Sequence, residues 1–308
     1  MLGNTEQISI VKDMAERDRI PHALMFTGEK GMGKKSLAEM LMLSVFGKNE
    51  RDIKRILEKN HPDIIYVRHE KADVIKVEEI RSQVADTVDI RPYESRYKAY
   101  IIPDAEKMNI QAQNTLLKTL EEPPEYCIIV LLVSDEKMML DTVRSRSMKI
   151  ALSPVGKEDI RDFLVSSGAD EKTADTAAQF AGGNPGRALM LSQSEEFNEN
   201  FRRAVSICRN VPGLDGYEIA LLARKTAAEC EDTEGLIDLI EDWYRDALRL
   251  KVSDDTGDIH FKGEMSALKR TGGEKVIPAC EQARKRLRAN VNKEAAMEHL
   301  FMVMKGTV

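Results

Sequence analysis

A glycine-rich stretch near the N-terminus has the residue types and spacing of a phosphate-binding loop. Gly28, Gly33 and Lys34 match the pattern Gly-x4-Gly-Lys-Ser/Thr, in which backbone N–H groups surround an anion and the lysine neutralises its charge. The next position of that pattern is a hydroxyl residue that ligates Mg²⁺, but here it is Lys35. The sequence therefore predicts a phosphate cradle without its metal ligand, or a relic loop that folds well and binds nothing. The candidate nucleotide-binding residues in this stretch are Gly28, Gly31, Gly33, Lys34, Lys35 and Ser36.

Apolar runs and amphipathic helices alternate in the first half of the chain, which is where such a loop must be positioned. Continuous apolar runs typical of buried strands occupy residues 23–27, 64–67, 99–102 and 127–133. Patterns typical of helices occupy residues 34–45, 50–58, 77–88 and 111–120. This alternation predicts a mainly parallel sheet covered by helices on both faces, with the glycine-rich loop following the first strand.

The character of the sequence changes after residue 150, because no further strand pattern occurs. Helical patterns occupy residues 157–166, 171–180, 185–192, 198–210, 217–230, 234–252, 273–290 and 293–304. A polar loop is expected at residues 253–261. We expect three domains: an α/β core at 1–152, a small helical domain at 153–195 and a larger helical domain at 196–308.

Composition narrows the class of protein. The 308 residues include 32% charged and 5% aromatic residues, and the net charge of −6 argues against binding nucleic acid through bulk charge. No apolar run is long enough to span a bilayer and no signal peptide is recognisable, so a cytoplasmic protein is expected. The four cysteines form no Cys-x-x-Cys pair and are interpreted as structural thiols in a reducing compartment.

One highly specific segment, at residues 114–124, reads Asn-Thr-Leu-Leu-Lys-Thr-Leu-Glu-Glu-Pro-Pro. Further distinctive segments lie at residues 21–23, 28–35, 61–63, 97–108, 142–147, 183–189 and 289–292. Together, along almost the whole chain, these segments resemble the AAA+ clamp-loader subunits, and among them the delta-prime class of bacterial DNA polymerase III.

The resemblance implies an AAA+ α/β core with a phosphate-binding loop, a helical lid and an all-α collar that joins a ring. The implied partners are the other clamp-loader subunits, both motor and delta-like, in a hetero-oligomeric complex. Through that complex the chain would serve the sliding clamp and primed DNA in replication, with no role at a membrane.

The resemblance also implies that the second metal position is altered. Counting back from Asn114, Pro103 takes the place of the family's metal-holding aspartate, and Asp104 takes the place of the carboxylate that orients water. Proline offers no side-chain ligand, and Asp104 is interpreted as a capping residue at a strand end. The first sensor would fall near Ser134. We expect no Mg²⁺-dependent hydrolysis, while binding of ATP or ADP stays open.

Two arginines match functional positions of the family. Arg146, in Ser-Arg-Ser where the family has Ser-Arg-Cys, matches the arginine finger that acts on the neighbouring subunit's ATP. The ordinary alternative is a surface arginine paired with a carboxylate. Arg187 matches the second sensor on the lid, or else forms an ion pair between lid and core.

Relatives often carry a four-cysteine zinc module before the His-Pro-Asp segment, but residues 46–60 contain no cysteine. No zinc is therefore expected, because the thiolate ligands are missing. The preferred interpretation is a stator subunit without ATPase activity. An active ATPase motor of the same ring, favoured by Lys34, and a free-standing regulator outside replication are the alternatives.

Overall fold

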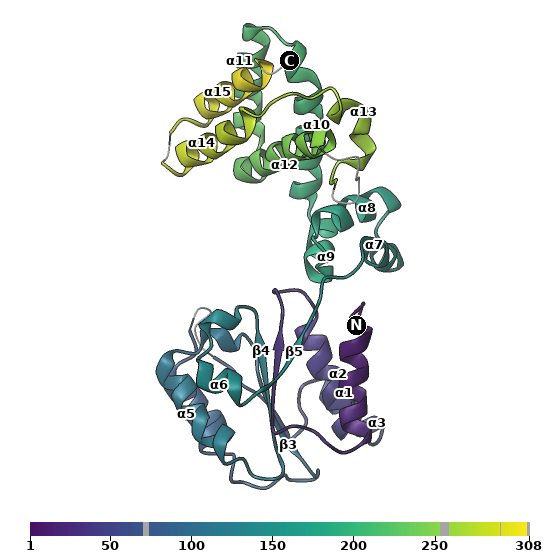
Figure 1. Cartoon of the computed structure of the whole chain (residues 1–308), viewed down its shortest axis with the longest axis vertical. Coiled ribbons are helices and arrows are strands. Elements are labelled where there is room, and N and C mark those ends of the chain that lie inside the picture. The colour runs from purple at the N-terminus through teal and green to yellow at the C-terminus, as the bar shows by residue number, and fades with distance from the viewer. Residues whose placement is uncertain (70–73, 253–258, 290, 307–308) are drawn as a thin grey trace. The chain divides into compact units, whose positions relative to one another are not determined.

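The computed structural model describes residues 1–69, 74–252, 259–289 and 291–306, which form two compact units (Figure 1). The first unit comprises residues 1–159 and 183–186, and the second comprises residues 160–182 and 187–308. Each unit has buried apolar clusters of its own. The finer division at 152/153 and 195/196 into core, lid and collar stays a prediction.

A five-stranded parallel sheet forms the centre of the first unit. The strand order is β2-β3-β4-β1-β5, and every neighbouring pair is parallel. The strands are β1 (Ala23–Thr27), β2 (Ile64–Tyr66), β3 (Lys98–Ile102), β4 (Cys127–Val133) and β5 (Met148–Ala151). The predicted α/β class with a parallel sheet is confirmed. The edge strand β5 was not predicted, because three of its four residues are exposed and it lacks a continuous apolar run.

Helices cover both faces of this sheet, with α1 and α2 on one side and α5 on the other (Figure 1). Successive strand residues alternate between the two cores, so Leu24 and Phe26 pack towards α1 and α2 while Met25 packs towards α5. The helices are α1 (Thr5–Glu16), α2 (Lys34–Phe46), α3 (Glu50–Leu57), α4 (Val77–Ile80), α5 (Ile110–Glu121) and α6 (Asp141–Ser145). The helix predicted at 77–88 is wrong in its length, because α4 passes into one π-helical turn at Arg81–Ala85. Helix α1 was not predicted.

Asp63, from the His-Pro-Asp segment, forms hydrogen bonds with the loop before β3. Its carboxylate accepts hydrogen bonds from the backbone N–H groups of Tyr93, of Glu94 at 3.0 Å and of Ser95 at 2.8 Å. Burial opposes the charged carboxylate, but the three N–H donors outweigh it and hold the pKa of Asp63 below its ordinary value of 3.8. The buried carboxylate therefore contributes to the stability of the first unit.

The second unit is built from helices. They are α7 (Lys157–Ser166), α8 (Glu171–Phe180), α9 (Pro185–Gln193), α10 (Glu195–Asn210), α11 (Gly216–Glu229), α12 (Thr233–Val252), α13 (Met265–Leu268), α14 (Val276–Arg288) and α15 (Lys293–Lys305), with the first residues of α7 and α9 assigned to the first unit. Phe180 of α8 packs edge-on against Phe197 and Phe201 of α10, so residues on both sides of position 195 share one core.

Residues 253–258 of the predicted polar loop lie outside the described residues. Within the described ranges no helix is both long and apolar enough to cross a bilayer.

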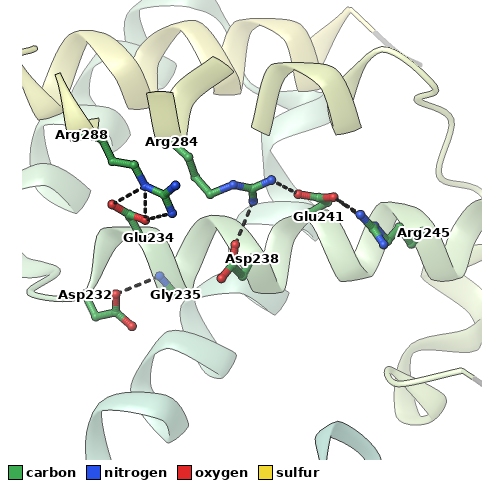
Figure 2. A network of polar contacts seen from close by, with 8 residues as sticks. All are labelled: Asp232, Glu234, Gly235, Asp238, Glu241, Arg245, Arg284 and Arg288. Atoms are coloured by element: carbon green, nitrogen blue, oxygen red, sulfur yellow. Dashed lines mark hydrogen bonds and ion pairs between the residues drawn. The ribbon is translucent and has the colours of Figure 1, made fainter. Parts of the chain in front are cut away.

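An ion-pair network joins α12 to α14 in this unit (Figure 2). Arg284 of α14 lies 2.8 Å from Asp238 and 2.5 Å from Glu241 of α12. Glu241 is buried and also pairs with Arg245, one helical turn further along α12. Arg284 thus neutralises a carboxylate that burial would otherwise penalise.

Candidate functional site

The glycine-rich loop leads from β1 into α2, the context that a phosphate-binding loop requires. Gly28, Gly31 and Gly33 have φ values of 146°, 96° and 101°, in the region that favours glycine. Gly33 is the N-cap residue of α2, so the positive end of this helix faces the loop. The glycines therefore allow the backbone conformation that a phosphate-binding loop needs, and the binding of a phosphate here stays a prediction.

Lys34 is buried and bonded to the loop itself. Its Nζ donates hydrogen bonds to the carbonyl of Gly28, to the carbonyl of Glu29 at 3.0 Å and to Oγ of Ser134 at 2.9 Å. Burial lowers the pKa of Lys34 below that of an ordinary lysine, although the carboxylates of Glu106 and Asp104 raise it in part. A phosphate group bound here would have to compete with these oxygen acceptors for the ammonium group.

Two residues from neighbouring strand ends complete this cluster. Ser134 follows β4, and its backbone N–H donates to the Glu106 carboxylate at 3.1 Å. The polar residue expected at Ser134 thus lies beside Lys34. Glu106 was not predicted, because its role depends on the turn after β3, where Asp104 adopts a left-handed conformation that spacing alone does not reveal.

The residues at the two metal positions do not fit Mg²⁺. Lys35 is exposed on the first turn of α2 and brings a positive charge where a hydroxyl ligand is needed. Ser36 is exposed one residue later, about 100° further around the helix. Pro103 offers no side-chain ligand atom. Asp104 precedes the 3-10 turn at Ala105–Lys107, but its side chain accepts no capping hydrogen bond there, and its carboxylate lies 3.6 Å from Nζ of Lys107. Hard oxygen ligands are missing from both positions, so no chemical step is assigned to a metal here.

Residues 183–186 belong to the first unit and contact the loop directly. Asn184 Nδ2 donates to the carbonyl of Lys30 at 2.8 Å, and the Gly186 N–H donates to the carbonyl of Gly31 at 3.1 Å. A Cβ atom on Gly186 would lie 2.7 Å from Cα of Gly31, which leaves no room for a side chain. Arg187 follows on α9 and is exposed, but it belongs to the second unit, and its contact with phosphate stays a prediction.

Arg146 lies at the C-terminal end of α6, between β4 and β5. Its side chain is 38% exposed and its NH2 group lies 2.8 Å from Oε1 of Glu121, the last residue of α5. Its NH1 group donates to the carbonyl of Thr142 at 3.2 Å. Ser147, which departs from the family's cysteine, is buried and its hydroxyl donates to the carbonyl of Val143 at 2.9 Å. Arg146 therefore has both an exposed guanidinium and a defined set of local contacts.

A second group of possible metal ligands, formed by Asp52, His61 and Glu94, is also unsuited to a metal. Nδ1 of His61 accepts a hydrogen bond from the Asp63 N–H at 3.2 Å, so the neutral ring carries its proton on Nε2, which faces Glu94 at 3.9 Å. Glu94 is in turn paired with Arg55 at 2.6 Å. A metal would have to displace both the Nε2 proton and this arginine.

The four cysteines are buried free thiols. Burial raises the pKa of Cys127 and of Cys280 to about 12, so both stay protonated near neutral pH. Protonated thiols are poor zinc ligands. The absence of zinc stays a prediction.

Comparison with known proteins places the chain in a family. Residues 3–156, half of its length, match the model described as DNA polymerase III, delta subunit. The chain belongs to this family. The resemblance to clamp-loader subunits that the sequence predicted is thus confirmed.

Relatives are similar over different shares of the chain. The DNA polymerase III subunit delta' of Bacillus subtilis (strain 168) is 28% identical over an alignment of 317 positions, which covers 97% of this chain and 95% of that protein. The DNA polymerase III subunit tau of the same organism is 32% identical over 169 residues, which cover 52% of this chain but 30% of that protein. A DNA polymerase III gamma subunit-related protein from Thermotoga maritima has the same fold, with a TM-score of 0.51 at 18% identity over 98% of this chain and 99% of that one.

Proposed function

We propose that this chain is a delta-prime-like stator subunit of a bacterial DNA polymerase III clamp loader. It supports the ATP-driven loading of a sliding clamp onto primed DNA without hydrolysing ATP itself, and it supplies Arg146 to the ATP site of a neighbouring motor subunit. The similarity to the Bacillus subtilis delta' subunit supports this proposal because it extends over nearly the whole of both chains.

The observation that carries the proposal is the loss of an oxygen ligand at both metal positions beside an otherwise intact glycine loop. Without Mg²⁺ the main neutralisation of charge during phosphoryl transfer is missing, so Lys35 and Pro103 together remove hydrolysis. The contacts of Lys34 with the carbonyl of Glu29 and the hydroxyl of Ser134 add to this, because a phosphate would have to compete with them for the ammonium group.

The chemistry assigned to Arg146 requires only an exposed, oriented guanidinium. A planar cation at a subunit boundary stabilises the negative charge that spreads over the phosphoryl oxygens in the transition state. The ring, the lid and the collar remain parts of this proposal, and so does the contribution of Arg187.

An active ATPase motor of the same ring is the second candidate. The positive φ values of Gly28, Gly31 and Gly33 favour it, because they keep the backbone in a cradle conformation.

Steady-state ATP hydrolysis by the purified chain separates the two candidates. The stator proposal expects no turnover above background with or without Mg²⁺. Turnover that depends on Mg²⁺ and disappears in Lys34→Ala would establish the motor instead. A nucleotide titration with and without Mg²⁺ shows separately whether ATP or ADP binds, and the proposal expects any binding to be insensitive to the metal.

A further inference from the structure

The ion pair between Arg146 and Glu121 joins two segments that are 25 positions apart in the sequence. Glu121 ends α5, Arg146 follows α6, and their charged atoms lie 2.8 Å apart. Both side chains are partly exposed, at 38% for Arg146 and 50% for Glu121. An exposed pair of this kind contributes little to stability, so its position suggests another role.

The position of Glu121 in its helix strengthens this point. A carboxylate in the last turn of a helix faces the negative end of the helix dipole, which is unfavourable for the helix itself. Among the residues that the structure describes, Glu121 forms an ion pair with Arg146 alone. The carboxylate is therefore explained by its contact with the guanidinium and not by a benefit to α5.

The contacts of Arg146 leave part of its guanidinium available. Arginine has five N–H donors in a rigid plane. Glu121 engages NH2, while NH1 donates to the carbonyl of Thr142 at 3.2 Å and to the hydroxyl of Ser145 at 3.5 Å. Nε takes no part in these contacts and can still donate to an incoming anion while the group is held in place.

We infer that Glu121 is a positioning residue for Arg146: its carboxylate fixes the guanidinium in the orientation in which the arginine meets the phosphate of a neighbouring subunit. This inference rests on the proposed function. A long arginine side chain loses rotamer freedom when it is ordered, and an ion pair made in advance lowers the cost of ordering it in the transition state.

The experiment compares Glu121→Ala, Glu121→Gln and Arg146→Ala, each in the clamp loader reconstituted with its partner subunits. Glu122→Ala is the matched control, because Glu122 is the next residue, is exposed and has no ion pair within the described part of the chain. We expect Glu121→Ala to lower kcat at the affected ATP site by about threefold to tenfold with little change in KM. Glu121→Gln keeps the side-chain length and one acceptor oxygen, so it should lose less.

A double variant separates positioning from a structural effect. With Arg146 already replaced by alanine, Glu121→Ala should cause no further loss, because the group that it positions is gone. Equal losses in both backgrounds, or an effect of Glu121→Ala no larger than that of Glu122→Ala, would overturn the inference. If Arg146→Ala itself leaves ATP hydrolysis unchanged, the finger in the proposed function fails. If Arg146→Ala lowers ATP hydrolysis but the Glu121 variants do not, Arg146 acts as a finger and Glu121 does not position it.

Discussion

Lys34 and Arg146 are two cations of the same α/β unit, and they are held in opposite ways. Lys34 is 8% exposed and is enclosed by two carbonyls and a hydroxyl of its own unit. Arg146 is 38% exposed and is held by the carboxylate of Glu121, the carbonyl of Thr142 and the hydroxyl of Ser145. The phosphate-loop cation is directed inward, and the other cation remains accessible to a partner molecule.

The two settings predict different consequences when each cation is removed. A buried charge with internal partners stabilises the unit that contains it, and its loss is measured as unfolding free energy. An exposed charge with a weak local partner contributes little to stability, and its loss is measured only in the complex. The variants below test this distinction.

Arg146→Ala has the largest expected effect. The reconstituted complex should assemble normally, while hydrolysis at the neighbouring site falls by about a thousandfold or more, the effect of losing an arginine finger. Total ATPase should fall partly, because only one of the ATP sites in the proposed ring would be affected. Arg146→Lys should restore little, because an ammonium group cannot reproduce the planar fork. Steady-state ATPase and clamp-loading assays measure both effects.

Normal assembly together with unchanged hydrolysis and clamp loading would show that Arg146 is an ordinary surface arginine. A folding defect in the free Arg146→Ala protein would contradict the comparison itself, because an exposed cation should not stabilise its own unit.

Asp63→Asn is expected to have the largest effect on stability. Asparagine keeps one acceptor oxygen for three backbone N–H groups, so the free energy of unfolding should fall by about 2 to 4 kcal/mol. Because the pKa of Asp63 is lowered in the folded state, its contribution is fully present above about pH 4 and is lost as the pH falls through the folded-state value. Urea unfolding of both proteins between pH 3 and 7 measures this, and the difference between their stabilities should become smaller as the pH falls below about 4.

Lys34→Met tests the buried cation, and its expected effect on stability is smaller than that of Asp63→Asn. The variant leaves the oxygens of Gly28, Glu29 and Ser134 without their donor, so we expect a loss of about 1 to 3 kcal/mol in unfolding free energy. Lys35→Met, at the exposed neighbouring position, should change stability little and serves as the control. If Lys34→Met is as stable as the parent, the lysine does not stabilise the loop and is available for phosphate, which would favour the motor.

Two arginines of the second unit test the same distinction between buried and exposed charges, and their expected effects on stability are the smallest. Arg284→Ala removes a partner of buried Glu241 and should cost about 1 to 2 kcal/mol in denaturant unfolding. Arg288→Ala breaks an exposed pair with Glu234, 2.7 Å apart, and should leave the melting temperature unchanged within error. Equal effects of the two substitutions would mean that burial of the carboxylate does not decide the outcome (Figure 2).

The sequence predicted the elements that carry continuous patterns. The four apolar runs became β1 to β4, and the loop after residue 27 has the conformation that its glycines predict. The strand β5 was missed because it lacks a continuous apolar run. The π-helical turn after α4 was predicted as ordinary α-helix, because Ile80, Val84 and Val88 keep a helical apolar spacing.

The sequence indicated candidate residues for the site but not their contacts. Ser134 lies beside Lys34, near the position predicted for a polar sensor. The sequence did not reveal that Glu106 accepts a hydrogen bond from Ser134 or that Glu121 pairs with Arg146. Both carboxylates acquire their partners through the turns that follow β3 and α6, and sequence spacing does not specify where such turns direct a side chain.

The backbone contact between Gly186 and Gly31 has a mechanical consequence. Side chains usually separate packed segments, and their rotamers can absorb small displacements. Here one hydrogen bond of 3.1 Å joins main chain to main chain, and no side chain would fit between Gly186 and Gly31. Residues 183–186 and the glycine-rich loop, which belong to the same unit, are thus coupled with very little slack. A displacement of either segment must be followed by the other, or the hydrogen bond is stretched and finally lost.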